Sequence, residues 1–196
     1  MKILVLAALA AVFEEAKAAF RKAAQLWRDN TCIDIEEYEV PKVKGSGKLP
    51  RDLLAVVNGD GCVSKVGKEG IGPQTLTLGE GCESVGIAAH EIGHALGFFH
   101  TQARHDRDEF ITVHEENIKH DWRLDFGKQD EETNNNYELT YDYGSIMHYG
   151  SRSPNAAIDD SKRIMEAKDG NYTETLGSDI ISFYDILMMN KLYECL

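Results

Sequence analysis

The feature that most constrains this chain is a cluster of histidines between residues 88 and 108, AAHEIGHALGFFHTQARHDRD. Four of the seven histidines of the chain lie in this stretch. His90 and His94 are four residues apart, so on a helix they share one face, one turn from each other. Both imidazoles can then reach a single metal ion at roughly 2.0–2.1 Å, as zinc requires. For this pair alone, a solvated polar helix face is the alternative.

The residues that follow favour the metal site. Glu91 projects about 100° around the helix from His90, so it lies beside a bound ion. Gly97 can take a left-handed backbone and end the helix, which lets His100 arrive as a third ligand. The spacing His-Glu-x-x-His-x-x-Gly-x-x-His is the elongated zinc signature of the metzincins. We therefore predict one zinc ion per chain, bound by His90, His94 and His100.

A second motif, Ser145-Ile146-Met147-His148-Tyr149, can form the tight turn that carries a methionine below such an ion. Alone, Met147 would be interpreted as a core residue, because methionine fills gaps well. Downstream of the zinc signature it is interpreted as a Met-turn. His148 is expected to pack and form hydrogen bonds rather than bind metal.

Histidines and charges outside the two motifs receive structural interpretations. His105, His114 and His120 are expected to be surface or structural residues. Arg104 and its neighbours Asp106 and Arg107 are expected to form a network of salt bridges and hydrogen bonds.

The spacing of apolar residues predicts an α+β fold. A helix with an apolar stripe is expected from Phe13 onward. Strand-like runs occupy residues 31–78, and a second helix is predicted over residues 84–96, with Ser84 as its N-cap. After Gly97 regular patterns become sparse until a final helical segment, ISFYDILMMNKLYEC.

Length and charge exclude some classes of protein. A chain of 196 residues suits a single domain with a sizeable core. The net charge of −12, without any basic stripe, argues against a nucleic-acid partner. The apolar run ILVLAALAAVF is too short for a stable membrane span. With Ala8-Leu9-Ala10 as a cleavage site, residues 1–11 can be a signal peptide; the alternative is a buried strand or the start of a core helix.

The cysteines indicate an oxidising compartment. Cys32, Cys62, Cys82 and Cys195 form no Cys-x-x-Cys pair, so two disulfides are favoured over a thiolate metal site, with three pairings possible. Asn171-Tyr172-Thr173 is an acceptor sequence for glycosylation and points to the same compartment. We expect a secreted glycoprotein.

These residues together resemble the astacin family of zinc endopeptidases. HEIGHALGFFH, RHDRD and SIMHY carry the resemblance, and TCIDI, GCVSKVG, QTLTLGEGC, ENIKHDW and NKLYEC fall in family order, from about Glu14 to Cys195. The resemblance implies a two-lobed, zincin-like single domain over residues 12–196. Its upper lobe, about 12–97, would hold a twisted mixed sheet and two long helices. Its lower lobe, about 98–196, would be mostly irregular with a final helix.

The resemblance also implies a secreted zinc endopeptidase that hydrolyses internal bonds of protein or peptide substrates. Zinc-activated water would attack the peptide carbonyl, with Glu91 as general base. Tyr149 would be a further zinc ligand that swings away to stabilise the oxyanion. The family's disulfide pattern would pair Cys32 with Cys195 and Cys62 with Cys82.

The strand QTLTL is expected to bind the substrate. As the last strand before the zinc helix, it would be an edge strand whose unpaired backbone groups pair antiparallel with an extended peptide. This substrate strand comprises Gln74, Thr75, Leu76, Thr77 and Leu78.

Two departures from the family pattern raise an alternative. The apolar run leads straight into the first helix, without the usual upstream strand and pro-segment, so the sheet is expected to be one strand short. Thr101 replaces the glutamate that usually pairs with a newly released N-terminus. The alternative function is a catalytically weak zinc-binding relative that acts by interaction. In either case a monomer is expected.

Overall fold

The computed structural model describes residues 3–39 and 49–195. The chain divides into two compact units, one formed by residues 1–98 with 189–196 and the other by residues 99–188. Within the described ranges, none of the helices combines the length and the apolar character needed to cross a membrane.

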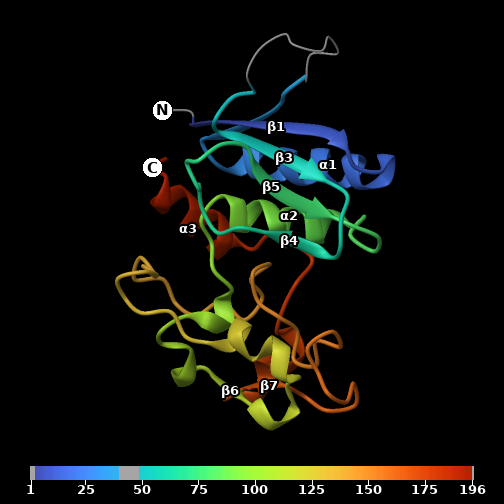
Figure 1. Cartoon of the computed structure of the whole chain (residues 1–196). Helices are drawn as coiled ribbons and strands as arrows, with labels where there is room; N and C mark the ends of the chain where they lie inside the picture. The colour runs from blue at the N-terminus through green and yellow to red at the C-terminus, as the bar shows by residue number, and fades with distance from the viewer. Residues whose placement is uncertain (1–2, 40–48, 196) are drawn as a thin grey trace. The chain divides into compact units, whose positions relative to one another are not determined.

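The first unit is built on a five-stranded sheet (Figure 1). Its strands are β1 (Ile3–Ala11), β2 (Ile33–Glu37), β3 (Leu53–Val57), β4 (Cys62–Ser64) and β5 (Gln74–Leu78). The order is β2-β1-β3-β5-β4, and only the pair of β4 and β5 is antiparallel. Among the described residues, β2 and β4 are therefore the edge strands.

The N-terminal apolar run forms β1, in the interior of this sheet. Residues 3–7 pair with β2, and residues 6–11 pair with β3. Parallel strands inside a sheet often read as continuous apolar runs, and such a run mimics the core of a signal peptide. Residues 3–11 thus form the buried strand that was the alternative to a signal peptide. This strand also corrects the expectation of a missing strand.

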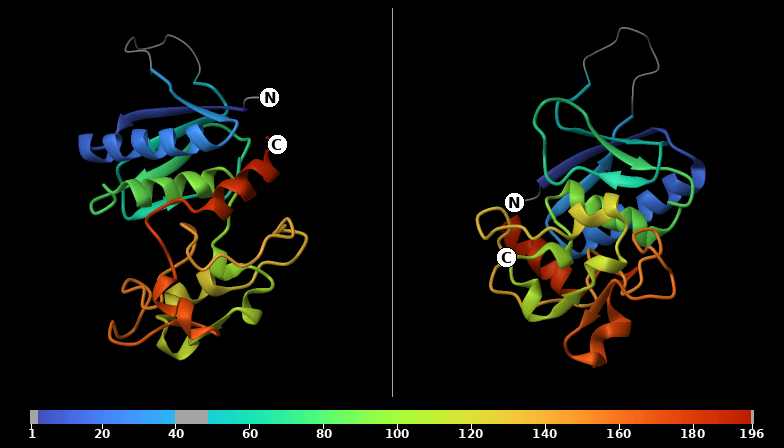
Figure 2. Two further views of the ribbon diagram at one scale, coloured as in Figure 1. Left: turned by 180° about the vertical axis from the view of Figure 1, so that it is seen from behind. Right: turned by 60° about the horizontal axis from the view of Figure 1, so that its bottom comes forward.

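Two helices, α1 (Glu14–Asn30) and α2 (Val85–Ala95), cover the same face of the sheet (Figures 1 and 2). Small and aromatic residues form the buried side of α1, namely Ala16, Ala19, Phe20, Ala23, Ala24 and Trp27. The Trp27 indole N–H donates to the Ala89 carbonyl of α2 at 3.1 Å. Phe13, predicted to belong to the stripe, is 53% exposed because it occupies the N-cap position before the first turn.

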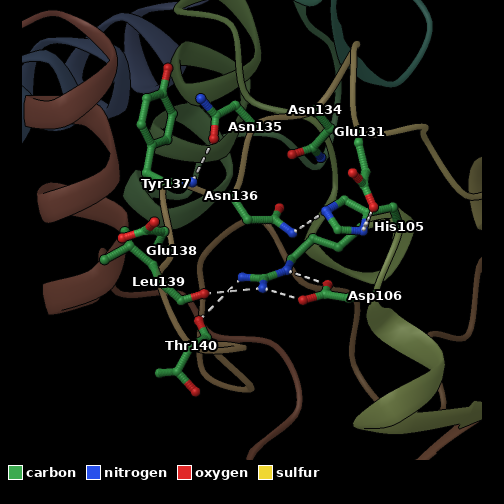
Figure 3. A pocket seen from close by; sticks show the side chains of 11 residues that line it. His105, Asp106, Glu131, Asn134, Asn135, Asn136, Tyr137, Glu138, Leu139 and Thr140 are labelled. Atoms are coloured by element: carbon green, nitrogen blue, oxygen red, sulfur yellow. Dashed lines mark hydrogen bonds and ion pairs between the residues drawn. The ribbon is translucent and has the colours of Figure 1, made fainter.

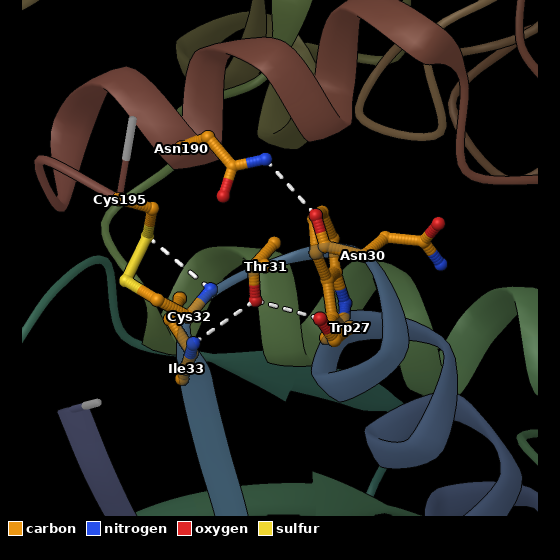
Figure 4. The surroundings of a disulfide bond; sticks show 7 residues. All are labelled: Trp27, Asn30, Thr31, Cys32, Ile33, Asn190 and Cys195. Carbon is orange, nitrogen blue, oxygen red and sulfur yellow. Dashed lines mark hydrogen bonds between the residues drawn. A yellow bond between two sulfur atoms is a disulfide. The ribbon is translucent and has the colours of Figure 1, made fainter. Parts of the chain in front are cut away.

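Both disulfides lie in the first unit and have the pairing that the family resemblance implies. Cys32 is bonded to Cys195, and Cys62 is bonded to Cys82. Figure 4 shows the first bond beside the end of α1, where the Asn190 side-chain amide donates to the Asn30 carbonyl at 2.9 Å. The first bond fastens the chain after α3 (Phe183–Leu192) to the start of β2.

The second unit is mostly irregular, as the resemblance implies. Its elements are the antiparallel pair β6 (Ile111–Val113) and β7 (Met165–Ala167) and the short 3₁₀ helices η1 (Thr101–Ala103), η2 (Arg107–Glu109), η3 (Glu115–Asn117), η4 (His120–Phe126) and η5 (Gly170–Thr175). Its core contains Ile111, Ile118, Phe126, Tyr141, Ala156, Ala157, Ile164, Met165, Ala167 and Leu176. The α+β fold is thus confirmed.

Candidate active site

Helix α2 places the first two histidines, and its end directs the chain toward the third. The Ser84 hydroxyl caps the helix by accepting the Ile87 N–H at 3.0 Å, as predicted. Gly97 has a φ of +107°, a conformation that strongly favours glycine. The helix therefore ends at Ala95, one residue after His94, and the backbone turns before it reaches His100.

His90, His94 and His100 form a group that could hold a metal ion, because their ligand atoms all lie within 4.8 Å of one another. The rings of His90 and His94 are nearly perpendicular, with centroids 4.6 Å apart. The structure thus brings together all three predicted histidine ligands.

The state of His94 fits a zinc site. Its Nδ1 lies 2.7 Å from the Phe98 carbonyl oxygen, so in the neutral ring Nδ1 carries the proton and Nε2 is the unprotonated nitrogen, the form that a metal-binding imidazole takes. Burial, with the neighbouring charge of His90, lowers the pKa of His94 to about 4, which keeps the ring neutral as metal binding requires. Three imidazoles are a ligand set that zinc accepts.

Glu91 is buried on the same helix, with 5% of its surface exposed. Its carboxyl group accepts a hydrogen bond from the backbone of Ser64 in β4, whereas its Oε2 atom has no hydrogen-bond partner among the described residues. Burial raises the pKa of Glu91 to about 7, and the bond from Ser64 opposes the rise. A carboxyl group in this state can both accept and release a proton near neutral pH.

The Met-turn lies against the segment that follows His100. The Thr101 N–H donates to the Met147 carbonyl at 2.9 Å, and the Tyr149 N–H donates to the Gln102 side chain at 3.0 Å. Met147 is buried, with 1% of its surface exposed. The Tyr149 ring lies beside His100, with centroids 4.4 Å apart.

His148 has the packing role that the sequence predicts. It is buried, its Nε2 lies 2.7 Å from the Tyr141 hydroxyl, and its Nδ1 lies 2.7 Å from the Tyr149 carbonyl oxygen. Burial lowers the pKa of His148 to about 4, and the bond to Tyr149 opposes the shift. Both ring nitrogens have partners, so neither is left for a metal.

The predicted arginine network is also present. The buried Arg104 guanidinium donates to both carboxylate oxygens of Asp106, at 2.9 and 2.8 Å, and to the carbonyls of Leu139 and Thr140. Figure 3 shows these three partners. Partial burial raises the pKa of Asp106, but the bonds and charge of Arg104 outweigh it and hold that pKa below its ordinary value. The network braces the loop of residues 131–140.

The other histidines stand apart from the metal group. His105 lines a cavity of about 550 Å³ beside this loop, with Nε2 2.9 Å from the Asn136 amide nitrogen (Figure 3). His114 lies 3.4 Å from Glu166, and the His120 side chain is 92% exposed. They are surface or structural residues, as expected.

The prediction for the substrate strand is wrong. The strand of residues 74–78, β5, lies between β3 and β4 and pairs with both, so it is no edge. The edge strand on this side is β4, which the sequence shows only as the short run CVS. The contact of Ser64 with Glu91 was not predicted either. No local pattern marks it, because it joins residues 27 positions apart in the chain.

Comparisons with known proteins agree with this geometry. The family model "Astacin", which describes a peptidase family, matches residues 7–194. Zinc metalloproteinase nas-31 of Caenorhabditis elegans is 46% identical over 90% of this chain, and zinc metalloproteinase nas-36 of Brugia malayi is 39% identical over 88%. The chain spans only 27% and 28% of the length of these two relatives.

A solved structure shows the same fold. High choriolytic enzyme 1, a hatching enzyme zinc-protease from the medaka fish Oryzias latipes, superposes with a TM-score of 0.83 at 28% identity, covering 100% of this chain and 91% of that chain. The match of the family model over nearly the whole chain is the deciding finding. This chain belongs to the astacin family of peptidases.

Proposed function

We propose that this chain is a secreted zinc endopeptidase domain that hydrolyses internal peptide bonds of protein substrates. The observation that carries the proposal is Glu91, a buried carboxyl group on the same helix as two members of the His90, His94 and His100 group; one of its oxygens has no hydrogen-bond partner in the part of the chain that the structure describes. These histidines would hold one zinc ion. Family membership supports the assignment.

Glu91 is the proposed general base and acid. A zinc ion in such a site supplies Lewis-acid chemistry, which acidifies water and polarises a carbonyl group. Glu91 takes a proton from the attacking water as the water oxygen bonds to the carbonyl carbon. When the C–N bond breaks, Glu91 returns that proton to the leaving amine. The free Oε2 is the atom proposed to hold the proton.

Tyr149 is the proposed oxyanion donor. Its ring lies against His100 and also contacts Phe126, with centroids 5.7 Å apart. We propose that its hydroxyl joins the three histidines as a further ligand of zinc at rest. During reaction it would turn to donate a hydrogen bond to the carbonyl oxygen, where negative charge develops.

The proposed binding site for the substrate backbone is β4. Its outer edge is not paired with another strand in the described residues, so an extended peptide can add to the sheet there, antiparallel to β4. The link from Ser64 to Glu91 supports this assignment, because it joins the edge strand to the proposed base. Recognition through backbone groups suits an enzyme that cleaves inside proteins.

We also propose that the protein is secreted and glycosylated, on the basis of its disulfides and of an exposed acceptor asparagine. Two disulfides are typical of oxidising compartments. Asn171 is exposed in η5, where a glycan would meet solvent. Expression in a eukaryotic secretory host should yield protein in the medium whose mass falls on treatment with an endoglycosidase, and Asn171→Gln should abolish that fall.

Glu91→Gln is the variant that tests the catalytic proposal. It keeps the size of the side chain but cannot accept the proton, so we expect cleavage of a quenched peptide library to fall by about 10²–10⁴-fold. Zinc content should stay at one per chain. His94→Ala should lose both zinc and cleavage.

Chelator treatment completes the test. Chelation should abolish wild-type cleavage, and added zinc should restore it. A wild-type protein that binds one zinc per chain but cleaves no peptide would favour the catalytically weak relative instead. That alternative has lost one of its supports, since β1 supplies the strand that was expected to be missing.

A further inference from the structure

A series of hydrogen bonds links three buried polar side chains at the start of the Met-turn, and none of the three takes part in the proposed chemistry. Thr101 Oγ1 donates to Ser145 Oγ at 3.0 Å, and Ser145 Oγ donates to Asp185 Oδ1 at 2.6 Å. Thr101, Ser145 and Asp185 are 9%, 2% and 5% exposed. We name this series of hydrogen bonds the Thr101–Ser145–Asp185 relay. All three residues belong to the second unit.

The carboxylate fixes the direction of every hydrogen bond in the relay. Asp185 Oδ2 accepts the N–H groups of Ile146 and Ser182, both at 2.9 Å. An ionised carboxylate only accepts hydrogen bonds, so Ser145 must donate its proton to Asp185. The two lone pairs of Ser145 Oγ then accept hydrogen bonds from the Thr101 hydroxyl and from the Met147 N–H, the latter at 3.0 Å. The donor and both acceptor positions of the Ser145 hydroxyl are therefore occupied.

Burial makes this arrangement sensitive to the loss of any donor. It raises the pKa of Asp185 above its ordinary value, while the bonds from Ser145, Ser182 and Ile146 oppose the rise. Each of these bonds favours the ionised form of the carboxylate. A buried polar network of this kind is rigid when every member has a partner.

The relay ends on the residue next to the third histidine. Thr101 is held at two atoms, by its hydroxyl on Ser145 and by its N–H on the Met147 carbonyl. We propose that Asp185 is a positioning residue for zinc binding: through Ser145 and Thr101, it fixes the backbone on which His100 is presented to the ion. The inference rests on the proposed zinc site, and it assigns to these residues a function beyond packing the Met-turn.

The paired variants Thr101→Val and Thr101→Ser test the relay directly. Valine keeps the shape of threonine and removes the hydroxyl, whereas serine keeps the hydroxyl. Groups that orient metal ligands change metal affinity by about 10–100-fold. We expect the zinc Kd to rise at least about tenfold in Thr101→Val and to stay near the wild-type value in Thr101→Ser.

Asp185→Asn should weaken zinc binding to a similar extent. The asparagine oxygen can still accept backbone N–H groups, but its amide would then point two donors at a Ser145 oxygen whose lone pairs are occupied. Because both variants break one relay, Thr101→Val and Asp185→Asn combined should raise the Kd by less than the product of the single effects.

Thr173→Val is the matched control. Thr173 is as buried as Thr101, at 8% exposed, and its hydroxyl accepts the Ala167 N–H at 3.2 Å, away from the relay. Zinc affinity should be unchanged in this variant. Affinity is measured on zinc-loaded protein by competition with a chromophoric chelator. The absorption spectrum of the cobalt-substituted protein should change in Thr101→Val alone of the three threonine variants, because it reports ligand geometry.

Two results would overturn the inference. One is a wild-type Kd in Thr101→Val, and the other is a loss of affinity in Thr173→Val as large as that in Thr101→Val. If Asp185→Asn does not fold, the threonine variants decide alone. If the wild type cleaves peptides and Thr101→Val keeps the wild-type affinity for zinc, only the relay is contradicted. If the wild type binds zinc tightly but cleaves no peptide, only the proposed function is contradicted.

Discussion

Asp106 neutralises a buried charge, that of the Arg104 guanidinium. The Arg104 side chain is only 5% exposed, and Asp106 supplies its only carboxylate partner among the described residues. Removing one partner of a buried ion pair costs more than the pair itself contributes, because the remaining charge stays out of water. The stability of the second unit should therefore depend on the ionisation of Asp106.

Asp106→Asn should lower the free energy of unfolding by about 1–3 kcal/mol at neutral pH. The pKa of Asp106 is depressed in the folded protein, so its contribution is complete above the ordinary pKa of about 3.9 and is lost as the pH falls through the folded value. The difference between wild type and variant should therefore shrink below about pH 4.

Urea unfolding of both proteins across this pH range measures that difference. Loss of zinc in acid affects both proteins and largely cancels. Asp121→Asn, at a side chain 97% exposed, should behave as wild type throughout. If the difference in unfolding free energy between wild type and Asp106→Asn stayed the same in acid, the role given to Asp106 would be wrong.

Among single residues, the histidines and Glu91 could be predicted because their geometry is local. Positions four apart on a helix share a face whatever the rest of the chain does. Ser64 could not be predicted, since its approach to Glu91 depends on where β4 enters the sheet. Asp185 was missed for the same reason, as it reaches Ser145 across 40 positions of sequence.

At the scale of elements, periodicity predicted the helices better than the strands. The buried stripe of α1 follows the helical spacing. β1 has no alternation of polar and apolar residues, as is common for parallel strands in the interior of a sheet. The strand order could not be predicted, because the sequence does not show that the short β4 lies outside β5. Because of that order, the strand proposed to bind the substrate is β4, residues 62–64, and no longer residues 74–78.

The end of α2 carries the prediction that belongs to this scale. Gly97→Ala places a Cβ on a backbone with φ of +107°, 3.5 Å from a Leu192 methyl group. We expect a loss of about 1–3 kcal/mol in unfolding free energy from backbone strain, together with weaker zinc binding, because the turn leads to His100. Thermal unfolding and zinc competition measure the two effects.

Gly170→Ala is the control for that substitution. An added Cβ there meets no atom within 4 Å, and the backbone does not lie in the positive-φ region. This variant should unfold as the wild type does. Equal stability of Gly97→Ala and Gly170→Ala would show that the helix end does not need glycine.

For the whole molecule, the cysteine count predicted two disulfides but left three pairings open. Only the family resemblance selected the pairing now observed. Cys32–Cys195 closes a loop with a sequence separation of 163, whereas the separation for Cys62–Cys82 is 20. In the chain-entropy model, closing a longer loop removes more freedom from the unfolded chain.

The two disulfides should therefore differ in their effect on stability. Replacing Cys32 and Cys195 by serine should lower the free energy of unfolding by about 5 kcal/mol, and replacing Cys62 and Cys82 by about 3 kcal/mol. Denaturant unfolding of the two double variants under identical zinc saturation gives both values. The reverse order would mean that β4 depends on its disulfide for native structure, beyond loop entropy, since Cys62 lies within that edge strand. Peptide cleavage would then fall in the Cys62 and Cys82 variant alone, because β4 is the proposed substrate edge.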